Sequence, residues 1–457
     1  MLFDSLDKNK PIHMIGIGGV SMSGLAEITS SMGYIVTGSD AKISETVKKL
    51  MQNGITVFEG HNAENVINAQ LIVYTAAVKD DNPELVKARA LNIPIMERSD
   101  FLGELMKKYK ENICVCGTHG KTTTTSMLSL VFINANLDPT IQVGADLKQI
   151  DGNYRIGNPD YFIVESCEYV ESFLKFHPKT AVLLNIEEDH LDYYKNLDHI
   201  KSAFTKFLKL VPSDGNVILN SDDTDCIDVA KDLTCNVTTI GINNSSADWI
   251  AKDIKLNDNG CYSFVATNDI EALDITLSVV GYHNIYNALC VIATAKKYGI
   301  DSEVIIDSLE EFTGASRRFE YRGTLNGAKV YDDYAHHPTE ILATIKSAQS
   351  VPHNKLWIVF QPHTYTRTYA LFNEFKNTFK DVDELILADI YAAREKDTGL
   401  VSSQQLAIAI NEVSNNCRYL PTFDKIEEYL KENVSSGDLI LTIGAGDVTN
   451  ISYKLIK

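Results

Sequence analysis

Short apolar runs bounded by turn residues alternate along this chain with stretches whose apolar residues recur every three or four positions. The runs have the length of buried strands, and the stretches have the period of helices with one buried face. Such alternation predicts parallel sheets covered by helices on both faces. In the first part of the chain the predicted strands are residues 11–16, 34–37, 56–58, 71–75 and 93–96.

The same pattern continues to the C-terminus with one interruption. Further strands are predicted at residues 113–116, 161–165, 181–186, 216–220, 329–332, 356–360, 384–388 and 438–443, and helices at 284–298 and 302–312. Residues 249–280 instead alternate apolar and polar positions, which predicts a small antiparallel insert with strands at 262–266 and 275–279. A polar helix and turn around residues 107–112 and a hinge at 314–318 are the predicted boundaries.

A phosphate-binding turn is predicted where the strand at 113–116 meets a helix. The turn is Gly117-Thr118-His119-Gly120, and Lys121, Thr122 and Thr123 open the helix. Backbone N–H groups at such a turn cradle phosphates, the lysine adds a positive charge, and the hydroxyl after it can bind Mg²⁺. Val115 stands where the commoner, longer phosphate loop has its first glycine. The alternative to a phosphate loop is a chance Gly-Lys pair in a tight turn.

A second glycine-rich turn follows the first strand. It reads Gly16-Ile-Gly18-Gly19-Val20-Ser21, and Asp40 ends the next strand. This is the arrangement that binds a diphosphate at the helix N-terminus and a ribose hydroxyl at the acid. Ser21 occupies the position of the third glycine. The alternative is a turn that needs glycine only for close helix packing.

A metal site is predicted at the ends of two strands of the middle part. Glu165 ends one strand, and His190 follows another in the segment NIEEDHLDYY. Parallel strands open on one sheet edge, so both residues and Thr122 could hold Mg²⁺ together with phosphate oxygens. The alternative is that Glu165 and His190 cap nearby helices.

Three further pairs of polar residues are candidates for ligand contacts. Asn284 and Asn287 share a helix face and could bind an adenine edge, although Asn284 could also be a plain N-cap. Arg317 and Arg318 could reach a γ-phosphate, or they could be a solvated surface pair. His336 and Arg367 lie in two loops, DDYAHHP and FQPHTYTR, that follow strands, and an arginine there suits a carboxylate substrate.

Length and these motifs predict an α/β protein of about three domains, since the chain has 457 residues. The expected parts are a Rossmann-like N-terminal domain (1–108), a central P-loop-type ATPase domain with a mostly parallel sheet (109–314) and a C-terminal Rossmann-like α/β domain (315–457).

Charge, hydropathy and cysteine content bear on whether the protein binds nucleic acid or membranes and on the compartment in which it works. A net charge of −19, from 42 basic and 61 acidic residues, argues against general binding of nucleic acid or anionic membranes. No stretch has the apolar length of a membrane span, and the N-terminus lacks a signal-peptide pattern. Eight cysteines without a CxxC pair are typical of a reducing cytoplasm.

The motifs taken together resemble the Mur ligase family over essentially the whole chain. They are, in order, GIGGVSMSGLA, GTHGKTTTT, NIEEDHLDYY, GYHNIYNA, GASRRFEYRG, DDYAHHPTE and FQPHTYTRT. The short phosphate loop is this family's own form, which accounts for Val115. The resemblance is strongest to the branch that adds L-alanine to the lactyl carboxylate of UDP-N-acetylmuramate through an acyl phosphate, with ATP and Mg²⁺, in peptidoglycan precursor synthesis.

The resemblance implies roles for particular residues. The UDP-sugar would contact Gly16, Gly18, Gly19, Val20, Ser21, Asp40 and His61. ATP would contact residues 117–123, His283, Asn284, Asn287, Arg318 and Asp333. Lys121, Glu165, His190, Arg317 and Arg318 would be catalytic, Thr122, Glu165 and His190 would bind metal, and His336 and Arg367 would bind the amino acid. Small molecules are the expected partners of a monomer or weak homodimer, without nucleic acid or membrane insertion.

This chain departs from the family pattern at several positions. ESCEYVESF has fewer aspartates than many relatives, Thr364 stands where some relatives carry a second arginine, and Thr205 stands where sister ligases carry a modified lysine. The alternatives are a sister ligase that joins a recycled murein peptide to the same UDP-sugar, a folate-polyglutamate-type ligase, a nucleotide-binding regulator without catalysis, and a nicotinamide dehydrogenase.

Overall fold

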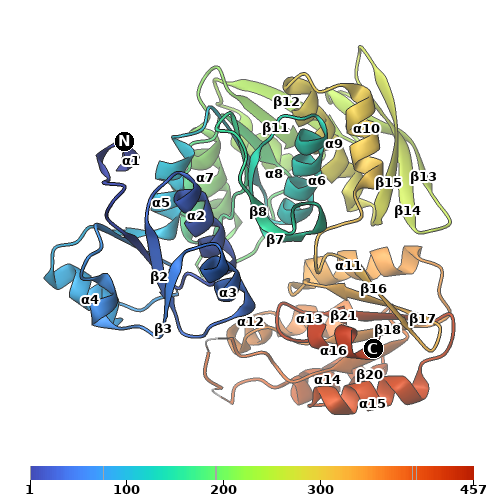
Figure 1. Ribbon diagram of the computed structural model, residues 1–457. Helices are drawn as coiled ribbons and strands as arrows, with labels where there is room; N and C mark the ends of the chain where they lie inside the picture. The colour runs from blue at the N-terminus through green and yellow to red at the C-terminus, as the bar shows by residue number, and fades with distance from the viewer. Residues whose placement is uncertain (1, 76, 191–192, 394, 398, 457) are drawn as a thin grey trace. The chain divides into compact units, whose positions relative to one another are not determined.

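The structure is a computed structural model that describes residues 2–75, 77–190, 193–393, 395–397 and 399–456. Its strands form three sheets flanked by helices, which confirms the predicted α/β class (Figure 1). The chain divides into two compact units, one made of Met1–Ile250 and Leu289–Ile305, the other of Ala251–Ala288 and Ile306–Lys457. The three predicted domain limits remain predictions.

The N-terminal sheet is parallel throughout, with the strand order β3-β2-β1-β4-β5. Its strands are β1 (Ile12–Ile15), β2 (Val36–Asp40), β3 (Thr56–Glu59), β4 (Leu71–Tyr74) and β5 (Ile95–Glu97), and its helices are α1 (Leu2–Ser5), α2 (Val20–Ser31), α3 (Glu45–Gln52), η1 (Ala63–Val66), α4 (Pro83–Ala90) and α5 (Arg98–Met106). The order of the strands reverses between β1 and β4. The glycine-rich turn after β1 therefore opens at the crevice where doubly wound sheets bind ligands.

The strands of the middle sheet that lie in the first unit follow the order β12-β11-β10-β6-β9-β7-β8. They are β6 (Glu111–Cys116), β7 (Thr140–Leu147), β8 (Gly152–Arg155), β9 (Tyr161–Glu165), β10 (Thr180–Leu183), β11 (Asn216–Asn220) and β12 (Asn236–Gly241); β13 (Trp249–Leu256) begins there and continues into the second unit. The helical elements are α6 (Lys121–Asn134), η2 (Lys148–Ile150), η3 (Tyr169–Lys175), α7 (Leu197–Leu208), α8 (Thr224–Ala230), α9 (His283–Lys297) and α10 (Ser302–Glu311).

The position of β6 decides where the site forms. This strand lies between β9 and β10 and is parallel to both. Consequently the segments that follow β6, β9 and β10 emerge side by side at one sheet edge. The prediction of a polar helix and turn through residue 112 was wrong at its end, because Glu111 and Asn112 already pair with Tyr161 and Phe162 of β9.

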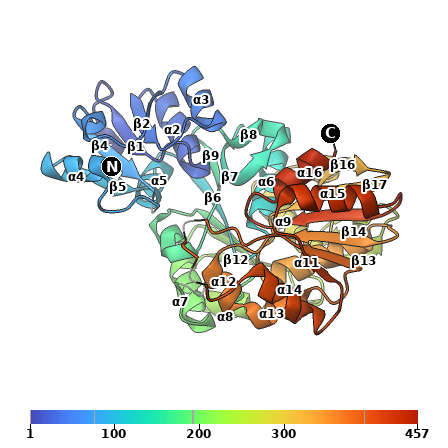
Figure 2. The same ribbon diagram turned by 90° about the horizontal axis from the view of Figure 1, so that it is seen from below.

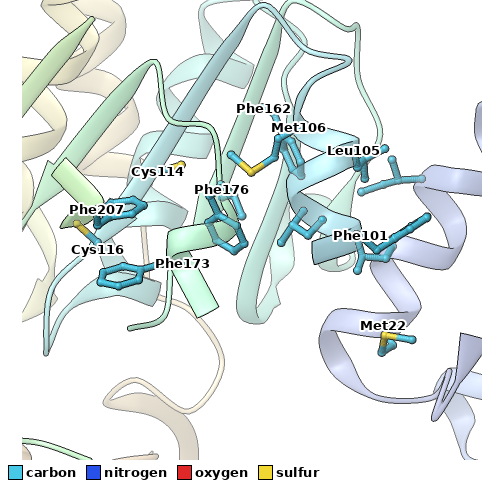
Figure 3. Close-up of a cluster of buried hydrophobic side chains, with 14 of the residues drawn as sticks. Met22, Phe101, Leu105, Met106, Cys114, Cys116, Phe162, Phe173, Phe176 and Phe207 are labelled. Atoms are coloured by element: carbon cyan, nitrogen blue, oxygen red, sulfur yellow. The ribbon is translucent and has the colours of Figure 1, made fainter. Parts of the chain in front are cut away.

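One hydrophobic core runs through both sheets of the first unit (Figure 3). Phe101 of α5 and Phe162 of β9 are fully buried, and Phe173 of η3 stacks on Phe207 of α7 with ring centroids 4.4 Å apart. Helix α5 approaches η3 so closely that a Cβ on Gly103 would lie 2.1 Å from the carbonyl oxygen of Lys175. The absence of a side chain at Gly103 therefore allows this contact.

The second unit contains a hairpin and the C-terminal sheet (Figure 2). The hairpin pairs β14 (Cys261–Thr267) with β15 (Ala272–Val280) in antiparallel fashion, as predicted. The C-terminal sheet has the order β16-β17-β21-β18-β19-β20, and all its pairs except β16–β17 are parallel. Its strands are β16 (Glu320–Leu325), β17 (Ala328–Asp333), β18 (Leu356–Phe360), β19 (Glu384–Leu387), β20 (Cys417–Tyr419) and β21 (Leu439–Ile443).

Helices cover both faces of the C-terminal sheet. They are α11 (Pro338–Ser350), α12 (Tyr365–Ala370), α13 (Phe372–Thr378), α14 (Ser403–Asn411), α15 (Phe423–Asn433) and α16 (Thr449–Leu455). One core cluster lies under α11, α13 and α14, and another lies under α15 and α16. Among the described residues, no helix combines the length and apolar character needed to cross a membrane.

We expect Gly103→Ala to destabilise the first unit by about 1–3 kcal/mol, because the new methyl group must displace the Lys175 backbone. Thermal unfolding measures this effect. Gly19→Ala is the control, since Gly19 has a φ of −66° and a Cβ there would meet no atom nearer than 3.4 Å. Equal melting temperatures for the two variants would contradict the close approach.

Candidate active site

The turn between β6 and α6 is fixed to the segment after β10. Thr118 N donates to Asn185 O (3.0 Å), His119 N donates to Asn185 Oδ1 (2.7 Å), and Asn185 Nδ2 donates to His119 O (3.1 Å). Gly117 and Gly120 have φ values of 134° and 83°, which favour glycine. A Cβ on Gly117 would also lie 3.1 Å from Asn185 N. The turn therefore has the backbone geometry expected of a phosphate loop.

Lys121 is held inside this loop. Its Nζ donates to the carbonyl oxygens of Gly117 (2.6 Å) and Thr118 (2.9 Å) and forms an ion pair with the buried Glu168 (3.0 Å). Burial by itself would lower the pKa of Lys121, but the Glu168 carboxylate outweighs burial and raises it. The side chain is therefore a fixed positive charge at neutral pH.

Two groups of possible metal ligands adjoin Lys121. Glu165 accepts hydrogen bonds from Thr122 Oγ1 (3.0 Å) and Gly144 N (2.7 Å). Ligand atoms of Glu168, Asp189 and His190 all lie within 4.8 Å of one another. The structure thus joins the predicted pair Thr122 and Glu165, and it gives His190 two acidic neighbours instead.

Neither candidate metal ligand acts as a helix cap. Glu165 accepts from the Thr122 hydroxyl of α6 and from the N–H of Gly144 in β7, not from the backbone of a helix N-terminus, and Asn196 rather than His190 caps α7. Glu168 and Asp189 were not singled out in the sequence, although each lies close to a predicted ligand along the chain. Leu191 and Asp192 of the same motif lie outside the described residues.

The glycine-rich turn after β1 contacts both sheets of the first unit. Gly18 N donates to Asp40 Oδ2 (2.9 Å), and a Cβ on Gly18 would come 2.9 Å from that oxygen. Asn153 Nδ2 donates to Val20 O (2.7 Å), and Gln142 Nε2 donates to Ser21 Oγ (2.8 Å). Packing alone explains glycine at position 18, so the contacts of Gly16, Gly18, Gly19 and Asp40 with a UDP-sugar remain predictions.

His61 is held by a buried carboxylate. Glu84 Oε2 lies 3.0 Å from His61 Nδ1 and accepts from Ser39 Oγ (2.6 Å), while Glu84 Oε1 accepts from Asn65 Nδ2 (2.7 Å) and lies 3.4 Å from His13 Nε2. Burial opposes ionisation, but the contact with His13 and the hydrogen bonds from Ser39 and Asn65 prevail and lower the pKa of Glu84 to about 2. Glu84 therefore orients the His61 ring.

In the second unit, the two His-containing loops meet at the carboxyl end of the sheet. The rings of His336 and His363 have centroids 5.7 Å apart, and Arg367 Nη1 donates to His363 Nδ1 (3.0 Å). Burial, together with the charges of His336 and Arg367, lowers the pKa of His363 to about 4. His363 is therefore neutral at pH 7 and can accept the hydrogen bond that orients Arg367.

Arg317 is tied into the C-terminal sheet rather than solvated. Its Nε donates to the fully buried Asp332 (3.1 Å), its Nη2 donates to Gly444 O, and its guanidinium lies 4.9 Å from the Tyr334 ring centroid. Arg318 lies 5.4 Å from the same ring. The alternative of a solvated surface pair is thus wrong for Arg317.

Asp333, Asn284 and Asn287 are buried in the second unit. Burial raises the pKa of Asp333 to about 6, although Phe319 N and Ala335 N both donate to it at 2.7 Å. Asn287 Nδ2 donates to Asn284 Oδ1 (2.8 Å), and Asn284 Nδ2 donates to Val280 O (2.8 Å). Because α9 begins at the exposed His283, Asn284 lies within the helix and is not its N-cap.

Three family models match this chain in succession. The model of the Mur ligase family, catalytic domain, matches residues 11–110, the Mur ligase middle domain matches 115–295, and the Mur ligase glutamate ligase domain matches 317–446. The chain belongs to the Mur ligase family. The resemblance inferred from the ordered motifs is thereby confirmed, and membership makes this protein a ligase with the family's three-domain architecture.

Curated Mur ligases are similar to this chain over its whole length. UDP-N-acetylmuramate–L-alanine ligase of Acetivibrio thermocellus is 53% identical over 99% of this chain and 96% of its own length. The protein of the same name from Clostridium novyi is 52% identical over 99% of this chain and 98% of its own.

Two solved structures also match 98% of this chain and 98% of their own chains. UDP-N-acetylmuramate-alanine ligase MurC of Thermotoga maritima is 29% identical with a TM-score of 0.83. A murein peptide ligase of Psychrobacter arcticus is 26% identical with a TM-score of 0.73. The Mur fold therefore extends over nearly the whole chain.

Glu84→Gln tests the charge of the buried carboxylate beneath His61. The pKa of Glu84 is about 2 in the folded protein against an ordinary 4.5, so the ionised group stabilises the fold above pH 4.5 and loses this contribution as pH falls toward 2. We expect the variant to be less stable than the wild type at neutral pH, by on the order of 3 kcal/mol.

Denaturant unfolding of both proteins across this pH range measures the difference. The gap between wild type and Glu84→Gln should shrink as pH falls below 4.5, because the wild-type carboxylate becomes protonated. A gap that stays constant down to strongly acidic pH would contradict an ionised Glu84.

Proposed function

We propose that this protein joins L-alanine to the lactyl carboxylate of UDP-N-acetylmuramate, with ATP converted to ADP and phosphate. The observation that carries the proposal is the lysine-bearing phosphate loop beside paired acids, in a chain that is 53% identical to an L-alanine ligase over 99% of its length. The reaction activates the carboxylate as an acyl phosphate, and the amine of L-alanine then displaces phosphate.

ATP and Mg²⁺ are the cofactors of this proposal. A MurF ligase of Thermotoga maritima, 16% identical and alike in fold, has been solved in complex with ADP. The donor set here suits a hard cation, since Thr122 and Glu165 form one hydroxyl–carboxylate pair and Glu168, Asp189 and His190 form a second group. We assign one ion to the first pair and a second to His190. A bound Mg²⁺ would supply positive charge to phosphate oxygens.

The fixed charge of Lys121 supports the phosphoryl-transfer step. Transition-state charge is stabilised best by groups that are already in place, because no reorganisation is then required. The carbonyl oxygens of Gly117 and Thr118 hold Lys121 Nζ at the phosphate loop. We assign the phosphates to the N–H groups of residues 117–123, and His283, Asn284, Asn287, Arg318 and Asp333 to the remainder of ATP.

The amino-acid substrate is assigned to the loops that follow β17 and β18. Arg367 is oriented by neutral His363 and can pair with the L-alanine carboxylate. The ring of His336, from the loop after β17, lies beside the ring of His363, from the loop after β18. Some relatives carry a second arginine at the position of Thr364, which has no charge. Of these two positions, only Arg367 can therefore pair with the carboxylate of L-alanine here.

The remaining assignments follow from the chemistry. UDP-N-acetylmuramate, L-alanine and ATP are small molecules of the cytoplasm, and the reaction needs no nucleic acid or membrane insertion. We retain the prediction of a monomer or weak homodimer. The second candidate is the sister activity, joining a murein peptide to the same UDP-sugar, because a murein peptide ligase shares this fold with a TM-score of 0.73.

Phosphate release from ATP with Mg²⁺ tests the proposal directly. Release that requires both UDP-N-acetylmuramate and L-alanine is the expected result. Release with an L-alanyl tripeptide but not with L-alanine would transfer the assignment to the sister activity. Lys121→Ala should lower the turnover number roughly 100- to 1,000-fold or more. Lys231→Ala, at an exposed lysine paired with Asp228, is the matched control.

Arg367→Ala tests the amino-acid site separately. Loss of a charge-assisted contact should raise KM for L-alanine about 10- to 100-fold while KM for ATP stays unchanged. Arg418→Ala is the control in the same domain. It also removes an arginine, but Arg418 packs over the Tyr429 ring, 4.6 Å from its centroid, and not against His363. An unchanged KM for L-alanine in Arg367→Ala would place the carboxylate site elsewhere.

A further inference from the structure

Among the described residues, Arg98 is a half-buried arginine with no carboxylate at ion-pair distance, although the adjacent Glu97 acts on it electrostatically. It is the first residue of α5, and its Nη1 donates to Ser21 Oγ (3.0 Å). Neighbouring arginines of the first unit form ion pairs, Arg89 with Asp80 and Arg155 with Asp138, both at 2.6 Å. Across residues 2–75, 77–190, 193–393, 395–397 and 399–456, Arg98 forms no ion pair within 4.0 Å.

The energetic cost of this arrangement calls for an explanation. Burial disfavours a charged side chain, and it lowers the pKa of Arg98 from its ordinary value. A guanidinium stays charged at neutral pH, so the cost is not relieved by loss of a proton. A folded protein that keeps such a group without an acid partner gains when an anion binds it.

Ser21 and Gln142 form a scaffold around the guanidinium. Gln142 Nε2 donates both to Ser21 O (3.0 Å) and to Ser21 Oγ (2.8 Å), the oxygen that also accepts from Arg98. Gln142 is 4% exposed, and its Oε1 is buried without a hydrogen-bond partner. The scaffold thus fixes a cation and leaves a buried acceptor oxygen for a ligand's hydroxyl or amide group.

The same scaffold lies between the two glycine turns. Ser21 lies in the first turn of α2, directly after the glycine turn, and Gln142 belongs to β7 of the middle sheet. Cys167 is an electrostatic neighbour of both Arg98 and Lys121. Arg98 therefore contacts the residue that follows the proposed UDP-sugar turn and shares a neighbour, Cys167, with Lys121 of the phosphate loop.

We propose that the guanidinium of Arg98 binds an anionic group of the UDP-sugar, with Ser21 and Gln142 as positioning residues that hold it. This inference rests on the proposed function. It also gives Ser21 a purpose, since a glycine at the third position of the turn would have no hydroxyl to accept from Arg98. Two anionic groups of this substrate share the required chemistry, the diphosphate and the lactyl carboxylate.

Titration calorimetry of Arg98→Ala with three ligands tests the proposal. The ligands are UDP-N-acetylmuramate, UDP-N-acetylglucosamine, which lacks the lactyl carboxylate, and ATP with Mg²⁺. We expect Kd for UDP-N-acetylmuramate to rise about 10- to 100-fold and Kd for ATP to stay unchanged. An equal loss for both sugars assigns Arg98 to the diphosphate, and a loss confined to UDP-N-acetylmuramate assigns it to the carboxylate.

Control variants separate binding from folding. Arg98→Lys keeps a positive charge and should recover part of the affinity, and Ser21→Gly should weaken sugar binding less than Arg98→Ala does. Arg89→Ala, at an exposed arginine of the same domain, should bind all three ligands as the wild type does. A merely structural role for Arg98 would lower the melting temperature without selecting between ATP and the sugar.

The outcomes for this inference and for the proposed function are distinct. If wild-type protein fails to bind UDP-N-acetylmuramate, the proposed function is wrong. If wild type binds it and Arg98→Ala binds it equally well, only the role of Arg98 is overturned. Steady-state kinetics of Arg98→Ala should agree with the calorimetry. KM for the UDP-sugar should rise, and KM for L-alanine should stay unchanged.

Discussion

The attachment of the β6–α6 turn to Asn185 is the constraint on which the rest of the site depends. Three hydrogen bonds join Asn185 to Thr118 and His119, so the turn cannot adjust independently of the segment after β10. The same segment carries Asp189 and His190 toward Glu168. Asn185, through its backbone and its side chain, therefore fixes the phosphate loop to the segment that carries the acidic groups.

The ion pair between Lys121 and Glu168 follows from this arrangement. A buried lysine is costly without a counter-charge, and Glu168 provides one while the loop carbonyls accept the remaining hydrogen bonds. Glu168 is also one of the possible metal ligands. The pair thus keeps the lysine charged and in position before a nucleotide arrives.

Buried central strands could be predicted from sequence because both of their faces are apolar. The runs at Cys114–Cys116 and Phe162–Val164 contain no polar interruption, and β6 and β9 lie where they were expected. The hairpin of β7 and β8 was missed, since the β7 segment TIQVGADL mixes polar and apolar residues and β8 is the edge strand of the sheet. Edge strands bury fewer side chains, so their sequences carry a weaker pattern.

The site could be predicted only where the chemistry is carried by residue type and order. Lys121, Thr122 and Glu165 follow from a turn and a strand end, and the structure joins Thr122 with Glu165. The partners Glu168 and Asp189 depend on how the backbone bends after each strand, which no local spacing records. Arg98 and Gln142 lie 44 residues apart in the chain and meet only through Ser21.

Several residues in or near the candidate sites have a strained backbone conformation with positive φ. Half of the positive-φ positions outside glycine are Asn or Asp, which tolerate this conformation. In the part of the chain that the structure describes, the exceptions are Val170, Glu171, His190, Arg317, Phe319, Thr364 and Ala393. All of these except Ala393 are candidate site residues or close sequence neighbours of residues in the candidate sites.

Each such position costs on the order of 1–3 kcal/mol and persists only where neighbouring contacts enforce it. His190, with a φ of 53°, donates its N–H to Asp189 and accepts from Tyr193 N and Tyr194 N. Thr364, with a φ of 65°, places Arg367 against His363. The Thr364 hydroxyl accepts from Arg367 N and caps α12, so the strained residue also fixes the start of the helix that carries Arg367.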